Sequence, residues 1–217
     1  MRLYLASTSP ARLQTLRNAG IEPVAIAPGV DEEALVTATE ATSGPLDAPR
    51  MVQLLAQAKA EAIVGLEPDG APIDGLILGG DSAFLTGGEV HGKPHRPEVA
   101  RLRWLAQNGG HGELWSGHWV IDHRGGSVRG AVGRADVATV RFAALDEPEI
   151  DAYIATGEPL LVAGAFTIDS LGGPFIRRVE GDPSTVVGLS LSTLRDLVRE
   201  LGVSWPSLWN RSARSSS

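Results

Sequence analysis

Hydrophobic residues recur along the chain with two different periods, which indicates a mixture of strands and helices. Residues 2–6 alternate in the manner of a strand. Helical spacing follows from Pro10, with Ser9 placed to cap the first turn and Gly20 placed to end the helix. A second short strand is predicted at residues 23–26. The chain thus opens with a strand, a helix and a strand.

The next part of the chain predicts a helix and a buried strand. Residues 40–48 form a loop rich in Ser, Gly, Pro and Thr, and a helix is predicted from Pro49 to Gly65. Lys59 falls at the edge of the buried stripe of that helix. An apolar run at residues 76–78 predicts a buried strand with Asp81 at its carboxyl end, where α/β sheets collect their ligands.

The rest of the chain continues this alternation. Helices are predicted at residues 97–107, 149–156 and 190–201, and strands at residues 114–122, 131–142, 165–168 and 175–179. The residues predicted to face inward in the first of these helices are Val99, Leu102, Leu105 and Ala106. We predict one α/β domain over residues 1–210, with a mixed sheet and two lobes around a cleft, and a polar tail at residues 211–217.

Composition narrows the function classes. The chain has 217 residues and a formal net charge of −7, which argues against binding a nucleic acid polymer through a basic face. It has no cysteine, so disulfides, cysteine-ligated metals and a thiol nucleophile are excluded. No apolar run is long enough for a membrane span or a signal-peptide core, so we expect a cytoplasmic protein with no membrane partner.

Lysine is unusually rare in this chain. Lys59 and Lys93 are its only lysines, against seventeen arginines. Chance explains this as well as function does. A functional reading is that both positions require a compact ammonium group, which the planar guanidinium of arginine does not supply.

Three conspicuous patterns have plain explanations. Residues 87–93 fit the first seven positions of a P-loop, but Pro94 replaces the Ser or Thr that would hold magnesium. His91 and His95 are four residues apart, yet the intervening Gly and Pro make a shared helix and a metal site implausible. The tryptophans are most simply packing residues.

A scattered set of polar residues could support chemistry on phosphates. Ser7, Ser9 and Arg12 lie at a strand-to-helix junction, where backbone amides favour anions. The other members of the set, on separate elements, are Glu32, Lys59, Asp81 and Lys93. Two carboxylates and three cations suit metal-assisted chemistry on a polyphosphate. Spacing alone does not bring these residues together, and each also has an ordinary structural reading.

The ordered series of short motifs resembles the Maf family of nucleoside triphosphate pyrophosphatases, once described as septum-formation inhibitors. The resemblance runs nearly end to end. Its motifs are Leu5-Ala6-Ser7-Thr8-Ser9-Pro10-Ala11-Arg12, Val30-Asp31-Glu32, Ala58-Lys59-Ala60, Gly79-Gly80-Asp81-Ser82, Gly92-Lys93-Pro94, Ser116-Gly117, Thr139-Val140-Arg141-Phe142, Tyr153, Gly157-Glu158-Pro159, Ala163-Gly164 and Val186-Val187-Gly188-Leu189.

The resemblance implies a fold, a reaction and a role for each residue. The fold would be a mixed α/β sheet resembling the inosine triphosphatase fold, with a deep cleft between two lobes, in a chain that is often dimeric. Water would attack between the α- and β-phosphates of a nucleoside triphosphate and release a monophosphate and pyrophosphate. Asp81 would accept the proton, and Glu32 and Asp81 would lie near Mg²⁺ or Mn²⁺. The residues implied to hold the triphosphate are Ser7, Ser9, Arg12, Lys59 and Lys93.

The chain also departs from the family pattern. Ala11, Ser82 and Asp169 replace residues that go with base preference in the family. A carboxylate only accepts hydrogen bonds, so Asp169 should favour a donor-rich base edge, such as that of guanine or cytosine. Leu161-Val162 replaces an Asp-Lys pair. These departures leave two alternatives to the enzyme: a non-catalytic nucleotide-binding regulator of cell division, and a different phosphohydrolase.

Overall fold

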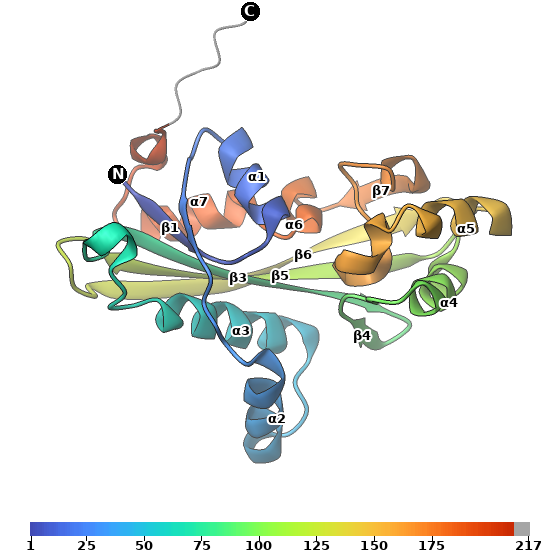
Figure 1. The fold of residues 1–217 in the computed structure, drawn as a ribbon, viewed down its shortest axis with the longest axis horizontal. Coiled ribbons are helices and arrows are strands. Elements are labelled where there is room, and N and C mark those ends of the chain that lie inside the picture. The colour runs from blue at the N-terminus through green and yellow to red at the C-terminus, as the bar shows by residue number, and fades with distance from the viewer. Residues whose placement is uncertain (211–217) are drawn as a thin grey trace, which may run out of the picture. The chain divides into compact units, whose positions relative to one another are not determined.

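The computed structural model describes residues 1–210, and the predicted tail at 211–217 lies outside them (Figure 1). The strands are β1 (Leu3–Ala6), β2 (Val24–Ile26), β3 (Gly75–Thr86), β4 (Glu89–His91), β5 (His111–His123), β6 (Gly130–Phe142) and β7 (Ile176–Glu180). The helices are α1 (Pro10–Asn18), α2 (Glu32–Ser43), α3 (Ala48–Ala62), α4 (Pro97–Gln107), α5 (Glu147–Ala155), α6 (Pro183–Val187) and α7 (Leu191–Glu200). Short 3₁₀ turns are η1 (Pro68–Gly70), η2 (Glu158–Leu161), η3 (Ala163–Ala165), η4 (Gly173–Phe175) and η5 (Trp205–Leu208).

The strands form one mixed sheet, which confirms the predicted α/β class. Their order is β2-β1-β3-β5-β6-β7, with β4 paired to β3. Strand β1 runs parallel to both β2 and β3, whereas the β3–β4 and β6–β7 pairs are antiparallel. Gly87 and Gly88 connect β3 to β4, so the P-loop-like sequence is a hairpin turn. No helix among residues 1–210 is both long and apolar enough to cross a bilayer.

The chain divides into two compact units. The first contains residues 1–81 and 117–135 and the chain from Leu191 onward, and the second contains residues 82–116 and 136–190. The two lobes and the cleft of the sequence analysis concern how such units sit together, and they stay predictions.

In the first unit, α3 covers one face of the sheet (Figure 1). Asp47 caps this helix by accepting a hydrogen bond from the Arg50 amide at 3.0 Å. The buried side chains of Ala60 and Ile63 pack with Tyr4, Ala6 and Ile77 of the sheet. This packing brings the backbone of α3 close to β3 and determines where Lys59 lies.

In the second unit, an aromatic cluster forms the centre of the core. Phe84, Trp104, Phe142 and Phe166 lie with ring centroids 5.0–6.0 Å apart in edge-to-face pairs. Tyr153 joins them through Trp104 at 5.6 Å. Such pairs combine a large buried apolar area with favourable quadrupole geometry.

The prediction that Asp81 follows the end of a strand is wrong. Strand β3 continues through Asp81 to Thr86. Gly79 and Gly80 are both extended and neither has a positive φ, so the strand is not interrupted there. Asp81 therefore projects from the middle of a long strand, whose backbone holds it more firmly than a loop would.

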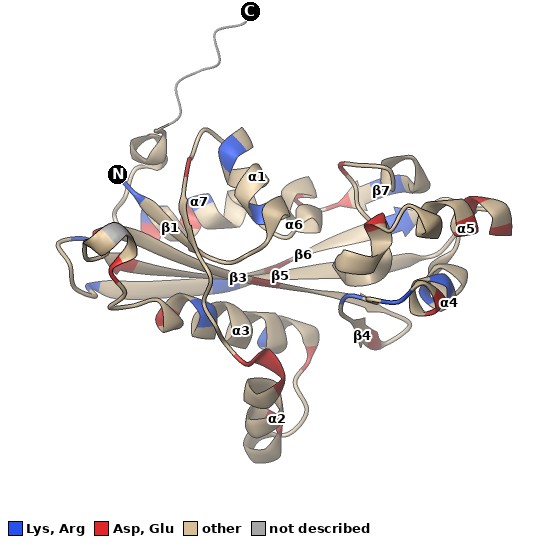
Figure 2. Cartoon of the chain, viewed as in Figure 1, with Lys and Arg blue, Asp and Glu red and all other residues tan. Residues whose placement is uncertain are grey.

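The predicted loop at residues 40–48 is partly wrong, because α2 extends to Ser43. Asp31 caps the helix by accepting from the Ala34 amide at 3.0 Å, and the acidic first turn that follows is red in Figure 2. None of its residues is fully buried. Without a buried stripe the sequence has no helical periodicity to detect.

The predicted strand at residues 165–168 is also absent, and the short helix α6 was not predicted. Ala165 closes the turn η3 with a positive φ of 60°. Its carbonyl accepts a hydrogen bond from Trp104 Nε1 at 2.7 Å, so a side chain takes the place of a neighbouring strand. The segment from 166 to 172 is a loop, and it carries Asp169.

The predicted inward face of α4 is displaced around the helix. Leu102 is 69% exposed and Leu105 is 40% exposed, whereas Ala100, Trp104 and Gln107 are buried. The large indole of Trp104 fixes which side faces the core, and the two leucines remain on the surface.

Candidate active site

The start of α1 gathers three of the predicted phosphate-binding residues. Ser9 caps the helix, and its hydroxyl accepts from the Arg12 amide at 3.4 Å. The buried Ser7 hydroxyl accepts from the Ser9 amide at 3.1 Å and from Arg12 Nη1 at 3.3 Å. A helix N-terminus with a buried guanidinium beside it is a suitable place for an anion.

Lys59 joins the two predicted carboxylates. Its Nζ lies 2.6 Å from Asp81 Oδ1 and 2.8 Å from Glu32 Oε1. The Lys59 side chain is 9% exposed and that of Asp81 is 13% exposed, whereas that of Glu32 is 50% exposed. The prediction that Lys59 lies at the edge of the buried stripe is wrong, because α3 packs so closely on β3 that the ammonium is enclosed.

Gly79 explains the close approach of α3 to β3. A Cβ at this position would lie 2.0 Å from the Ala56 carbonyl oxygen and 2.7 Å from the Ala60 amide nitrogen. Both are backbone atoms of the helix that carries Lys59. Glycine is therefore required here for contact between helix and strand, and not for an unusual backbone angle.

Gly79→Ala is expected to destabilise the protein by about 1–3 kcal/mol, because α3 must shift to admit the methyl group. The same shift would separate Lys59 from Asp81, so activity should fall with stability. Gly130→Ala is the matched control, since its Cβ would meet only Leu201 Cδ2 at 3.8 Å. Chemical denaturation measures both variants, and equal stability of the two would contradict the explanation.

Burial and charge oppose one another at Asp81. Burial raises the pKa of its carboxyl group, while Lys59 and Arg12 lower that pKa and Glu32 raises it, leaving it above the ordinary value. Burial also lowers the pKa of Arg12, and the charges of Asp81 and Glu32 partly counter this effect. Arg12, Glu32, Lys59 and Asp81 therefore form one electrostatic cluster. A carboxylate with a raised pKa is a better proton acceptor than an ordinary aspartate.

The donor set of this cluster fits a metal that is also bound by substrate. Among residues 1–210 no group of three or more His, Asp or Glu side chains could hold an ion. Oxygens of Glu32 and Asp81 nevertheless converge on one Lys59 nitrogen. Mg²⁺ is commonly bound by one or two carboxylates together with substrate phosphates and water. Two carboxylates fit this pattern, and they do not form a metal site on their own.

Four predicted residues lie outside both this cluster and the Ser7–Ser9 segment that contacts Arg12. Ala11 is half-buried in α1. Lys93, Ser82 and Asp169 belong to the second unit, where Lys93 and Asp169 are exposed. The Ser82 and Ser116 hydroxyls lie 3.1 Å apart, and Ser116 donates to the Thr185 carbonyl at 3.1 Å. Glu158 is extensively hydrogen-bonded, and its sequence motif gives no sign of this because most of its partners are ordinary loop residues.

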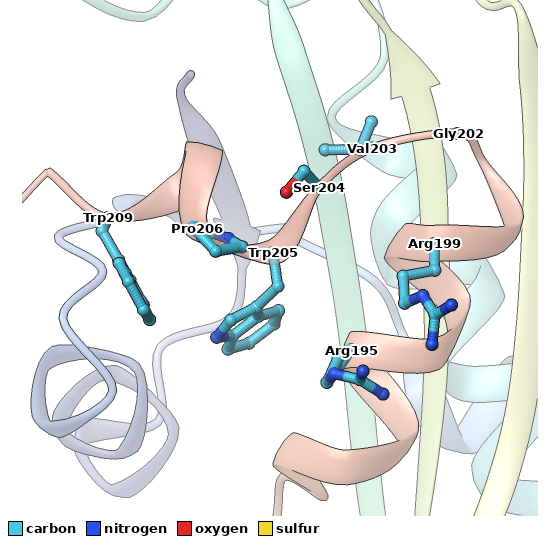
Figure 3. Close-up of a pocket in the computed structure, with 8 residues that line it drawn as sticks. All are labelled: Arg195, Arg199, Gly202, Val203, Ser204, Trp205, Pro206 and Trp209. Carbon is cyan, nitrogen blue, oxygen red and sulfur yellow. The ribbon is translucent and has the colours of Figure 1, made fainter.

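A cavity of about 480 Å³ lies elsewhere in the first unit, between α7 and η5 (Figure 3). Arg195 and Arg199 line it from α7, and Trp205 and Trp209 line it from the following segment. It contains none of the candidate residues and no carboxylate, so it offers no proton acceptor for hydrolysis.

Comparison with known proteins identifies one family and a set of similar chains. The family described as "Maf-like protein" matches residues 2–201. A protein of Leifsonia xyli subsp. xyli named nucleoside triphosphate pyrophosphatase is 69% identical over 215 residues, which cover 99% of this chain and 100% of that protein. Proteins with the same name from Nocardia farcinica and Saccharopolyspora erythraea are 48% and 47% identical, and the matches cover 96–98% of this chain and 97–98% of those proteins.

Proposed function

We propose, from the premise that this chain belongs to the family of Maf-like proteins, that it is a nucleoside triphosphate pyrophosphatase. The reaction is hydrolysis of the bond between the α- and β-phosphates, which yields a nucleoside monophosphate and pyrophosphate. The observation that carries the proposal is the buried Asp81 carboxyl group, which forms an ion pair with Lys59 and interacts electrostatically with Arg12. A proton acceptor surrounded by cations suits attack of water on a polyanion.

Each member of the cluster has a distinct task in this proposal. Asp81 removes a proton from the attacking water. Arg12 and the N-terminus of α1 bind phosphate oxygens, with Ser7 and Ser9 holding Arg12 in place. Lys59 favours the ionised form of the buried Asp81 and binds phosphate when the substrate enters.

A divalent cation, Mg²⁺ or Mn²⁺, completes the proposed site, and Glu32 and Asp81 would hold it. When bound, it would neutralise phosphate charge and favour ionisation of the attacking water. Since Glu32 and Asp81 are the only two carboxylates that the described residues bring to this site, we expect the metal ion to bind weakly to the nucleotide-free protein. A chelator should abolish activity, and millimolar Mg²⁺ or Mn²⁺ should restore it. Titration calorimetry without nucleotide should detect little binding, and a tightly held stoichiometric metal would contradict this.

Three residues of the second unit are proposed to contact the substrate because of the resemblance to the Maf family. Lys93 would bind phosphate, and Ser82, Asp169 and the first unit's Ala11 would set the base preference. A homodimer and a cytoplasmic location also belong to the proposal. Analytical ultracentrifugation and cell fractionation test these last two points directly.

A nucleotide panel tests the activity itself. Canonical and modified nucleoside triphosphates are incubated with Mg²⁺ or Mn²⁺, and pyrophosphate and orthophosphate are measured separately. Pyrophosphate release from at least one nucleotide supports the proposal. Binding without any release would indicate a nucleotide-binding regulator, and orthophosphate would indicate cleavage at another bond.

A further inference from the structure

Glu158 is an extensively hydrogen-bonded carboxylate of the second unit. Its Oε1 accepts from the Tyr153 hydroxyl at 2.9 Å, from the Gly172 amide at 3.0 Å and from the Thr167 hydroxyl. Its Oε2 accepts from the Ser170 hydroxyl at 2.7 Å and from the Leu171 amide at 3.2 Å. Burial raises the pKa of Glu158, but these hydrogen bonds outweigh it and lower the pKa to about 2. Glu158 is therefore ionised and accepts hydrogen bonds at neutral pH.

The partners of Glu158 define one loop. Four of them belong to residues 167–172, which we call the 167–172 loop. Tyr153 fastens the loop a second time, because its hydroxyl accepts from the Thr167 amide at 3.2 Å while its ring packs on Trp104. A Cβ on Gly172 would lie 2.5 Å from the Tyr153 hydroxyl and 2.6 Å from the Thr167 carbonyl oxygen, so the loop closes tightly.

Asp169 is the exception in this loop. It is exposed, and within residues 1–210 its carboxylate has no hydrogen-bond or ion-pair partner. Thr167 and Ser170, which flank residues 168–169, are both bonded to Glu158, and Ile168 packs against the core. The loop thus presents one unpaired carboxylate from a backbone that is fixed at both ends.

We infer that Glu158 is a positioning residue for substrate selection, holding the 167–172 loop so that Asp169 meets donor groups on the nucleotide base. This inference rests on the proposed function. Glu158 itself does not contact the substrate. A carboxylate that accepts from a donor-rich base edge gains from a fixed orientation, since the loop's ordering is already complete before the substrate binds.

Glu158→Gln tests the inference with little change in shape. An amide has one acceptor oxygen and one donor nitrogen, so it loses either the Oε1 or the Oε2 set of bonds. We expect kcat/KM for the preferred nucleotide to fall about tenfold, mainly through KM, because bonds to a charged group are lost. Hydrolysis of ribose 5-triphosphate, which lacks a base, should not change. Faster hydrogen exchange at the Leu171 and Gly172 amides should accompany the loss.

Three matched variants make the result decisive. Asp169→Asn should cause the same base-dependent loss, and the double variant should be no worse than Asp169→Asn alone, since Glu158 acts through Asp169. Glu158→Asp should recover part of the preference. Glu180→Gln, which removes an exposed partner of Arg141, should have no effect.

Each contrary outcome has one meaning. Equal losses on the nucleotide and on ribose 5-triphosphate, or additive losses in the double variant, would make Glu158 a general structural residue and overturn the inference. An unchanged Glu158→Gln protein would overturn it as well. If the wild-type protein released no pyrophosphate from any nucleotide, the proposed function would fail first, and the selection role would fail with it.

Discussion

Asp81→Asn is expected to lower kcat by about 10²–10⁴-fold, the usual contribution of a general base. Asparagine has nearly the same shape, and its amide oxygen still accepts from Lys59, which donates to Asp81 at 2.6 Å. It does not accept a proton from water at neutral pH. Steady-state kinetics with the preferred nucleotide measures this, and Asp151→Asn, in an exposed pair with Arg101, is the control expected to behave as wild type.

The Asp81→Asn variant should lose activity without losing thermal stability. Because burial raises the pKa of Asp81 in the folded protein, its neutral form is favoured by folding and its ionised form is not. Below the pKa that Asp81 has in the unfolded chain, its neutral carboxyl group contributes to the stability of the folded protein. This contribution is lost as the pH rises through the pKa that Asp81 has in the folded protein. The Asp81→Asn protein should therefore melt no lower than wild type at pH 7. A lower melting temperature together with retained activity would contradict both the role and the electrostatics.

Lys59→Met is expected to impair both folding and catalysis. It removes the ammonium held between Asp81 and Glu32, and breaking a buried ion pair typically destabilises by about 3 kcal/mol or more. Lys59 lowers the pKa of Asp81 and Glu32 raises it, so removal of Lys59 should raise that pKa further. The acid limb of the kcat/KM profile should move to higher pH.

The pH dependence of the stability of Lys59→Met tests whether Lys59 lowers the pKa of Asp81. As pH falls, the unpaired Asp81 gains a proton, so the difference in unfolding free energy between Lys59→Met and wild type should shrink. The second lysine provides the control. Lys93 is exposed, so Lys93→Met should keep wild-type stability and an unshifted pH profile while raising KM. Identical behaviour of the two variants would remove the special role assigned to Lys59.

Local features of the site could be predicted from the sequence because their causes are local. Ser9 and Pro10 marked the start of α1, and a cap and a first-turn proline act within one helical turn. The apolar run before Asp81 marked a buried strand, as found. The motif order indicated the Maf family, which the comparisons confirm.

The remaining features depend on contacts between distant segments. Burial of Lys59 follows from the packing of α3 on Gly79, and periodicity within one helix does not contain that information. Helix α2 has no buried stripe and so had no detectable period. Residues 165–168 were predicted to be a strand, but the backbone around them is bonded to side chains of Trp104 and Glu158 in place of a neighbouring strand. The local sequence does not reveal these distant partners.

Hydrolysis in ¹⁸O-labelled water, with wild type and Asp81→Asn compared side by side, tests the central claim most directly. Wild type should produce nucleoside monophosphate and pyrophosphate in equal amounts, with one label per turnover in one of these two products and none in orthophosphate. Asp81→Asn should produce neither product at a comparable rate. Labelled orthophosphate from wild type, or undiminished turnover without the Asp81 carboxylate, would contradict the account.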